Sequence, residues 1–201
     1  MIVLGLTGGP GTGKSLAAHY FESRGALILS GDEAGKEVVE KNSRILRKLI
    51  SQFGNSIIYP DGKLNRSQLG KIVFQDREAL AELNAIIHPG LLKLLKSKLI
   101  KYKKINRKLI VIDAALIYEW RIANWCDYIL VVTARRDIRL KRLMAKGLPH
   151  KQAVERIASQ MPDREKAALA DFVIKNNGSK RDLKRGVDEL YFALVSQKRN
   201  G

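Results

Sequence analysis

The sequence contains a single cysteine, Cys126, among its 201 residues. One cysteine cannot form an internal disulfide, and it has no second thiolate with which to build a zinc site. A lone thiol of this kind is typical of proteins that work in a reducing compartment. We therefore expect a cytoplasmic protein whose fold depends on its hydrophobic core.

Long apolar runs are also missing from the sequence. None approaches the roughly 20 residues that a helix needs to span a bilayer, so we expect no membrane partner. The apolar start, residues 2–6, has no basic leader and runs directly into a glycine-rich loop. We interpret it as a core strand and not as a signal peptide.

Acidic residues are scarce beside basic ones. The 20 Asp and Glu residues face 37 Lys and Arg residues, which gives a net charge of +17. Such a chain attracts anions, including nucleotides, phosphorylated metabolites and nucleic acids, and charge alone does not choose among them. The basic run at residues 93–108 alternates with Leu91, Leu95, Leu99 and Tyr102 at helical spacing. We interpret this run as an amphipathic helix with a solvated basic face, in preference to a nucleic-acid surface.

Five short apolar runs rich in β-branched residues are present, and stretches with helical periodicity separate them. They are residues 2–6, 26–29, 109–112, 128–132 and 172–174. This alternation predicts an α/β fold of three layers, in which helices cover both faces of a five-stranded parallel sheet. The core of this fold is expected to comprise residues 1–32, 108–135 and 162–201.

Two segments do not fit a simple alternation of strands and helices. Residues 33–107 are too many for one crossover helix, so they predict an inserted helical subdomain. Turn signals at residues 59–62 (YPDG) and at His88-Pro89 punctuate it. A second insertion, residues 136–161, reads as two helices, 136–146 and 150–161, joined by a Gly-Leu-Pro turn.

The glycine-rich loop at residues 8–15 reads GGPGTGKS and matches the P-loop pattern of nucleotide-binding proteins. Gly8, Gly11 and Gly13 let the backbone curl around phosphates, and the following helix points its positive end at them. Lys14 can reach the β- and γ-phosphates, and the Ser15 hydroxyl can ligate Mg²⁺. The loop therefore predicts binding of ATP with Mg²⁺, but it leaves the phosphoryl acceptor open.

Carboxylates follow two of the predicted strands, at the sheet edge where ligands of α/β folds bind. Asp32 can orient an acceptor hydroxyl or can serve as the N-cap of the next helix, and the residues alone do not separate these roles. Asp113 occupies the position of a Walker B acid that holds the Mg²⁺ shell through water. Glu119 is equally consistent with an acid near the metal and with an ordinary surface residue.

Basic residues recur along the second insertion at intervals of four, three and four: Arg135, Arg139, Arg142 and Lys146. Like charges at this spacing repel, so the stripe faces either water or a bound anion. We favour the second interpretation, in which the segment is a lid whose cations meet the phosphates.

Taken in order, these residues resemble the dephospho-CoA kinase family over nearly the whole chain. The motifs that carry the resemblance are LGLTGG at 4–9, GDE at 31–33 with VV at 38–39, DGKLNR at 61–66, IVF at 72–74, LNAIIHP at 83–89, DAALIYE at 113–119, RLM at 142–144, RI at 156–157 with QM at 160–161, ADFVI at 170–174 and NNG at 176–178.

The resemblance implies a fold similar to that of nucleoside monophosphate kinases. It implies transfer of the γ-phosphoryl group of ATP to the ribose 3′-hydroxyl of dephospho-CoA, which gives CoA and ADP. In that reading the first insertion binds the CoA substrate and the second is the lid. The expected partners are these small molecules, with no specific nucleic acid, and the expected assembly is a monomer or a small homo-oligomer.

The resemblance also assigns roles to single residues. Lys14, Asp32 and Arg142 are the expected catalytic residues, and Asp32, Arg66 and His88 are expected on the acceptor side. From the residues alone, His88 also fits a histidine that caps a turn before proline. The nucleotide is expected to contact the loop and one residue near the adenine: Gly8, Gly11, Thr12, Gly13, Lys14, Ser15, Leu16 and Asn176.

Four positions depart from the family pattern. Ser30 replaces an aspartate, Leu16 a threonine after the P-loop serine, Ala115 a proline, and Lys146 an arginine. Lysine cannot grip two phosphate oxygens as arginine does. The departures leave room for a kinase that acts on another small nucleotide. The net charge motivates a second alternative, a nucleic-acid-stimulated ATPase, which the absence of an aromatic-basic recognition motif disfavours.

Overall fold

The computed structural model describes residues 1–73 and 76–196, apart from the side chain of Arg77. Phe74, the last residue of the IVF motif, and residues 197–201, the end of the predicted core, lie outside the described residues. Within the described ranges, no helix is long and apolar enough to cross a membrane.

A five-stranded parallel sheet is the centre of the structure, with the order β2-β3-β1-β4-β5. Its strands are β1 (Ile2–Thr7), β2 (Leu27–Ser30), β3 (Leu109–Asp113), β4 (Tyr128–Thr133) and β5 (Phe172–Lys175). All five predicted strands are confirmed. Their β-branched residues suit a pleated surface that is buried on both faces, and β1 is buried along its whole length.

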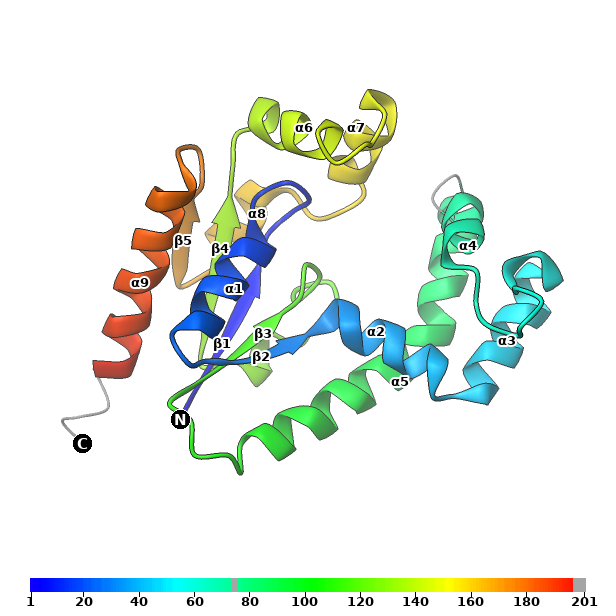
Figure 1. The fold of residues 1–201 in the computed structure, drawn as a ribbon, viewed down its shortest axis with the longest axis horizontal. Helices are drawn as coiled ribbons and strands as arrows, with labels where there is room; N and C mark the ends of the chain where they lie inside the picture. The colour runs from blue at the N-terminus through cyan, green and yellow to red at the C-terminus, as the bar shows by residue number, and fades with distance from the viewer. Residues whose placement is uncertain (74–75, 197–201) are drawn as a thin grey trace. The chain divides into compact units, whose positions relative to one another are not determined.

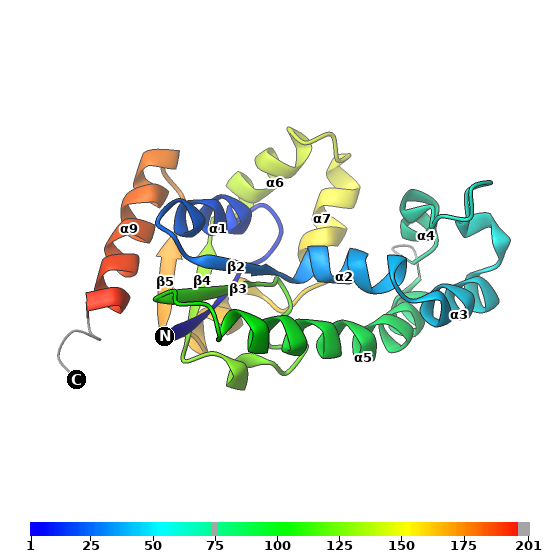
Figure 2. The same ribbon diagram turned by 60° about the horizontal axis from the view of Figure 1, so that its bottom comes forward.

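Helices α1 (Lys14–Ser23) and α9 (Lys180–Ser196) lie side by side over one face of the sheet (Figures 1 and 2). Phe21 of α1 and Val187 of α9 are fully buried, and both join a core that includes Leu4 of β1 and Val111 of β3. Burial of such side chains stabilises the fold by roughly 1.5–3 kcal/mol each.

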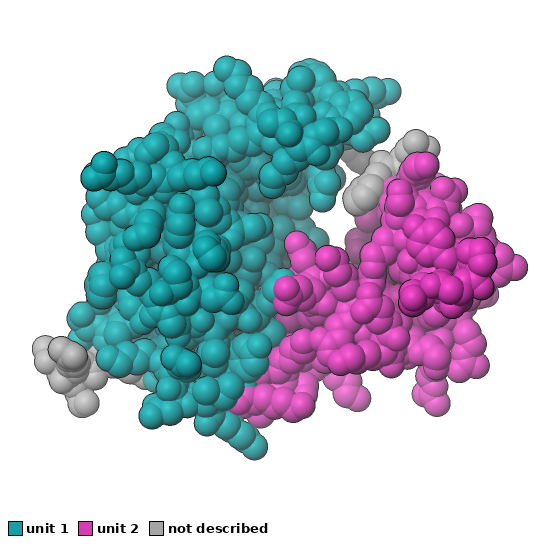
Figure 3. Space-filling model, in the orientation of Figure 1, with its two compact units in different colours: residues 1–30, 102–201 teal, residues 31–101 magenta. Residues whose placement is uncertain are grey.

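The chain divides into two compact units, which Figure 3 shows in separate colours. The first comprises residues 1–30 and 102–201, and the second comprises residues 31–101. The first unit contains the sheet, α1 and α9, together with η2 (Ala123–Trp125), α6 (Arg136–Met144), α7 (His150–Ala158) and α8 (Asp163–Ala168).

The second unit is helical and contains most of the segment predicted as an insertion, because residues 33–101 fall within it and residues 102–107 belong to the first unit. Its elements are α2 (Gly31–Glu40), α3 (Ser43–Phe53), η1 (Asn55–Ile57), α4 (Arg66–Val73) and most of α5 (Arg77–Tyr102). The predicted turn at residues 59–62 is present, because the Gly62 N–H donates to the Tyr59 carbonyl at 2.9 Å. Gly62 has a φ of 80°, which glycine adopts without strain.

Helix α5 runs through Pro89, where the sequence indicated a turn. The expected break at His88-Pro89 is therefore wrong, although proline inside a helix costs about 3 kcal/mol. The predicted apolar stripe supplies the compensation, since Leu91, Leu95 and Leu99 are almost completely buried. The next residue, Gly90, allows close packing, because a Cβ there would lie 2.7 Å from the Ile45 side chain.

The two helices expected in the second insertion are present but shorter than predicted. Helix α6 ends at Met144 and α7 ends at Ala158, where the sequence indicated residues 146 and 161. A third short helix, α8, follows Pro162 and was not expected. Pro162 is the N-cap residue, with a ψ of 140°, and Asp163 and Glu165 follow in the first turn, where carboxylates interact favourably with the helix dipole.

Candidate active site

The P-loop joins β1 to α1 at the carboxyl edge of the sheet. Strand β1 lies between β3 and β4, where the connections leave in opposite directions, and α/β folds bind ligands at such a point. Three loop glycines have positive φ: Gly8 at 152°, Gly11 at 79° and Gly13 at 98°. Side chains at these positions would be strained, so the loop geometry requires glycine.

Close packing adds a second requirement for glycine in this loop. A Cβ on Gly8 would lie 2.4 Å from the Val132 carbonyl oxygen, and one on Gly13 would lie 2.2 Å from the Asn176 amide nitrogen. The loop therefore sits directly on β4 and on the segment after β5. Neither residue can be enlarged without moving backbone or a buried amide.

Thr12 supports the loop from inside. Its side chain is fully buried, and its hydroxyl donates to the Gly9 carbonyl at 2.9 Å. Its backbone N–H also donates to that carbonyl, at 3.3 Å. The structure therefore gives this predicted nucleotide-binding residue bonds within the loop itself.

Lys14 and Asp113 form an ion pair between the start of α1 and the end of β3. Their side chains are only 11% and 12% exposed. The pairing follows from the sheet register, which places Leu6 of β1 beside Asp113. A lysine and an acid 99 residues apart thus meet where the phosphates and their metal are expected.

Two further predicted nucleotide-binding residues lie in the first turn of α1. The Ser15 side chain is exposed, as a hydroxyl that ligates a substrate-borne metal must be. Leu16 is half-buried and packs against the hydrophobic core. Its side chain therefore has a packing role at the position where the family commonly has a hydroxyl.

Arg142 and Asn176 hold the second half of the P-loop. The Arg142 guanidinium donates to the carbonyls of Gly11 and Thr12, both at 3.3 Å, and to that of Asn176 at 3.1 Å. The Asn176 side-chain amide donates to the Thr12 carbonyl at 2.7 Å. The fold thus brings Arg142, Asn176 and the loop together from three distant stretches of the sequence.

The predicted basic stripe does not share one environment. Arg139 is buried and ion-paired with Asp163, with 2.9 Å between Nη1 and Oδ2. Arg135 precedes α6 and pairs at the surface with Asp137. Lys146 is exposed beyond the end of the helix. The sequence predicted that the stripe faces either water or a bound anion. The structure shows a third arrangement for Arg139 and Arg142, which contact carbonyl groups of the P-loop.

The three acceptor-side candidates lie on separate helices of the second unit. Asp32 is exposed in the first turn of α2, which begins at Gly31, so it is not the N-cap. Arg66 begins α4 and donates to the Lys36 carbonyl and the Glu40 carboxylate, both at 3.1 Å. His88 is half-buried within α5, so it does not cap a turn.

Comparison with known proteins assigns the chain to a family. The family profile of dephospho-CoA kinase matches residues 2–182. The dephospho-CoA kinase of Syntrophotalea carbinolica is 37% identical over 196 residues, which cover 97% of this chain and 93% of that protein. The chain belongs to the dephospho-CoA kinase family.

Solved structures agree with the family assignment. A dephospho-CoA kinase from Campylobacter jejuni matches with a TM-score of 0.74 and 26% identity over 98% of each chain. A solved Thermus thermophilus protein matches with a TM-score of 0.79 and 30% identity, over 96% of this chain and 97% of that one. The predicted α/β P-loop fold is confirmed.

Behind the candidate site lies an ion pair that the sequence did not reveal. Lys166 of α8 is fully buried and pairs with Glu119 at 3.0 Å. It also donates to the Ala115 carbonyl, which accepts a second hydrogen bond from the Thr7 hydroxyl at 3.0 Å. Ala115 replaces a proline of the family pattern, but its backbone oxygen still joins β1 to α8. Glu119 is therefore part of a structural ion pair.

Among the described residues, no group of three or more His, Cys, Asp or Glu side chains is arranged to hold a metal. Kinases of this kind use Mg²⁺ that arrives with ATP and keeps mainly phosphate and water ligands. The exposed Ser15 hydroxyl and the Asp113 carboxylate, which pairs with Lys14, have the oxygen donors that suit such an ion. The residues present therefore fit a substrate-borne Mg²⁺.

Proposed function

We propose that this chain transfers the γ-phosphoryl group of ATP to the 3′-hydroxyl of dephospho-CoA, producing CoA and ADP in the last step of coenzyme A synthesis. The family match over residues 2–182 carries the proposal. The P-loop supports it, because its glycine conformations and the largely shielded Lys14–Asp113 pair are what a triphosphate site requires.

On the donor side, the loop N–H groups and the Lys14 ammonium stabilise the phosphates. The transferred group spreads negative charge over its equatorial oxygens, so a fixed cation lowers the barrier. ATP binding exchanges the Asp113 partner of Lys14 for phosphate oxygens. Arg142 adds a second cation as residues 136–161 close as a lid, and Asn176 contributes beside the adenine.

On the acceptor side, Asp32 accepts the proton of the 3′-hydroxyl. The bond from that oxygen to the γ-phosphorus forms as the bond from the phosphorus to the β,γ-bridging oxygen breaks, and ADP leaves. Arg66 and His88 bind the acceptor, and residues 33–107 serve as the CoA-binding insertion. Asp32 is exposed on α2, where a hydroxyl substrate can reach it.

Mg²⁺ neutralises charge on the phosphates when it is bound with ATP. The Ser15 hydroxyl would ligate it directly, and Asp113 would hold its shell through water. The remaining features of the proposal are a cytoplasmic location and a monomer or small homo-oligomer.

An acceptor panel tests the proposal. ADP formation is measured with Mg²⁺ and ATP, first alone and then with dephospho-CoA, AMP, CMP, shikimate or RNA. Dephospho-CoA should raise the rate sharply, and the others should not. Stimulation by AMP, CMP or shikimate would reassign the acceptor and keep the P-loop assignment. Stimulation by RNA that falls steeply with salt would indicate a nucleic-acid-dependent ATPase instead.

A further inference from the structure

Arg139 and Asp163 contact the first half of the P-loop from outside it. The Arg139 Nε donates to the Pro10 carbonyl at 2.8 Å, and its Nη1 lies 2.9 Å from the Asp163 carboxylate. The other oxygen of Asp163 accepts the Gly9 N–H at 3.2 Å. One ion pair thus satisfies a donor and an acceptor on two successive residues of the loop.

The pair is withdrawn from solvent. Its side chains are 8% and 14% exposed, and burial lowers the pKa of the Arg139 guanidinium although Asp163 opposes the shift. Two charges in such surroundings depend on each other, because either alone would be a poorly solvated ion. Gly9 fits closely over them, since a Cβ there would lie 2.3 Å from the Arg139 Nη2.

The contacted part of the loop has few other fixed bonds. Gly8 and Gly11 flank it with positive φ, so neither strand nor helix geometry defines the backbone between them. Thr12 holds the Gly9 carbonyl, but the Gly9 N–H and the Pro10 carbonyl point to Asp163 and Arg139. The conformation of the Gly9-Pro10 segment therefore depends on residues from α6 and α8.

The pair also sets the charge beside the expected phosphates. Asp163 brings a carboxylate against a loop that receives a polyanion, and Arg139 neutralises it there. Without Arg139 this carboxylate would repel the phosphates at short range and in a poorly screened site. Without the carboxylate, Arg139 would stay as a cation that phosphates tolerate.

We propose that Arg139 and Asp163 are a positioning pair for nucleotide binding. They fix the Gly9-Pro10 segment and cancel the carboxylate charge next to the phosphates, so that the loop binds ATP and ADP tightly. The proposal rests on the proposed function only for the donor nucleotide. It makes no use of the acceptor.

The test is a double-mutant cycle on the full chain. Wild type, Arg139→Gln, Asp163→Asn and the double variant are compared by calorimetric titration with Mg-ADP. ADP alone is the probe, so a wrong acceptor assignment cannot affect the result. Thermal unfolding of each variant is measured in parallel, and the KM values for ATP and for dephospho-CoA are measured in the panel assay.

Arg139→Gln should weaken ADP binding about tenfold, and Asp163→Asn should weaken it about twofold in the wild-type background. In the Arg139→Gln background the sign should reverse, because Asp163→Asn then removes an uncompensated carboxylate and strengthens binding. The KM for ATP should follow ADP affinity, while the KM for dephospho-CoA stays within about twofold.

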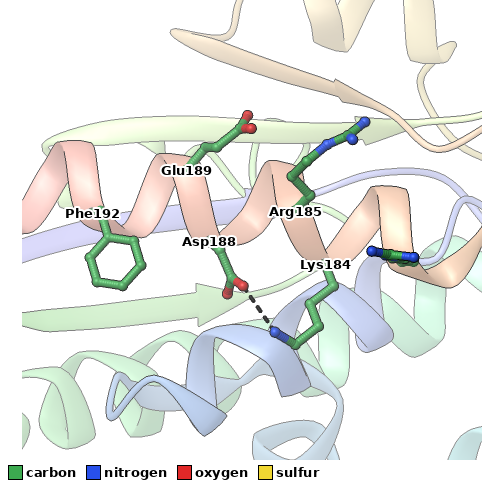
Figure 4. Close-up of a pocket in the computed structure, with 6 residues that line it drawn as sticks. Lys184, Arg185, Asp188, Glu189 and Phe192 are labelled. Atoms are coloured by element: carbon green, nitrogen blue, oxygen red, sulfur yellow. Dashed lines mark hydrogen bonds and ion pairs between the residues drawn. The ribbon is translucent and has the colours of Figure 1, made fainter.

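A matched control is available in the ion pair between Arg24 at the end of α1 and Asp188 of α9. Two hydrogen bonds of 2.8 and 2.6 Å join these side chains. Figure 4 shows Asp188 directed toward Lys184 on α9. Both residues line a hollow of about 350 Å³. Arg24→Gln should lower thermal stability and leave ADP affinity unchanged.

Two results would overturn the proposal. One is that the variants lose thermal stability but bind ADP as tightly as the wild type, which would give the pair a structural role only. The other is a loss of affinity on Asp163→Asn that is the same in both backgrounds. If Arg139→Gln fails to fold, Arg139→Met, which is also uncharged, replaces it in the cycle with the same expected sign reversal.

Discussion

The two units hold their candidate functional residues in different ways. In the first unit, the P-loop is fixed by glycine conformations, by Thr12 inside the loop and by Arg142 and Asn176 outside it. In the second unit, Asp32 and Arg66 are side chains at the surfaces of helices. The donor candidates are thus held by buried and partly buried hydrogen bonds, whereas Asp32 is exposed to solvent.

This difference has a chemical basis. A triphosphate is recognised by many converging backbone N–H groups, which demand one rigid loop. A hydroxyl acceptor needs one oriented carboxylate, and a helix surface can supply it. Changes near the P-loop should therefore impair nucleotide binding and chemistry together, and changes at Asp32 should impair chemistry alone.

Replacing Lys14, in the P-loop of the first unit, should have the largest effect on activity. Lys14→Ala removes the cation expected on the transferred phosphate and should lower turnover about 1,000-fold, measured as ADP formation at saturating substrates. Lys175→Ala, at the exposed end of β5, is the matched control and should leave turnover unchanged. Near-normal turnover in Lys14→Ala would remove the P-loop assignment.

Replacing Asp32 tests the candidate catalytic residue at the helix surface of the second unit. Asp32→Asn keeps the size of the side chain but cannot accept the proton, so kcat should fall about 100-fold while the KM for ATP changes little. Glu33→Gln removes the neighbouring carboxylate of the same helix turn and loses a comparable interaction with the helix dipole, so it is the matched control. If both variants alter only stability, Asp32 is a first-turn acid with no catalytic role.

Replacing Arg142 tests whether the loop and the lid act together. Arg142→Lys keeps the charge but loses the planar donor set that reaches three carbonyl oxygens, so kcat/KM for ATP should fall about tenfold. Arg136→Lys, on an exposed position of the same helix, should have no effect. Equal kinetics for the two variants would exclude Arg142 from the site.

The smallest expected effect concerns the second unit by itself. Hydrogen bonds from Lys98 and Lys41 lower the pKa of Glu37 to about 2 from an ordinary value of 4.5. A lowered carboxylate pKa stabilises the fold above pH 4.5, and the stabilisation disappears as the pH falls toward 2. Glu37→Gln should therefore reduce stability at pH 7 and much less at pH 3.

Chemical unfolding at the two pH values, followed by circular dichroism, measures this difference. Glu40→Gln, in the last turn of the same helix, is the comparison. A stability deficit of Glu37→Gln that is identical at both pH values would mean that the ion pairs of Glu37 do not produce the effect.

Local patterns were sufficient for the strands, for the start of α1 and for the P-loop, because each is encoded by residues close together in the chain. The break expected at Pro89 was wrong, since burial of Leu91, Leu95 and Leu99 outweighs the cost of proline in a helix. The ends of α6 and α7 were misplaced by two or three residues, as helix ends often are.

The roles assigned to Asp32, Arg66, His88, Arg142 and Asn176 stay predictions. The family resemblance supplied all five roles, and the residues alone had left the role of Asp32 open. Asp163 and Lys166 were missed altogether. Neither lies in a spacing pattern with its partner, and the contacts of Asp163 with Gly9 and of Lys166 with Ala115 join residues 154 and 51 positions apart. Only folding brings such residues together.

The sequence by itself determined the P-loop, the parallel sheet and the family, because glycine conformation, β-branched runs and motif order are properties of local chain segments. The tertiary structure decided how the loop is held. Lys14 meets Asp113 through the strand register, and Arg139, Asp163 and Arg142 reach the loop because α6 and α8 pack beside it. Those contacts depend on the positions of whole elements, which no local pattern specifies.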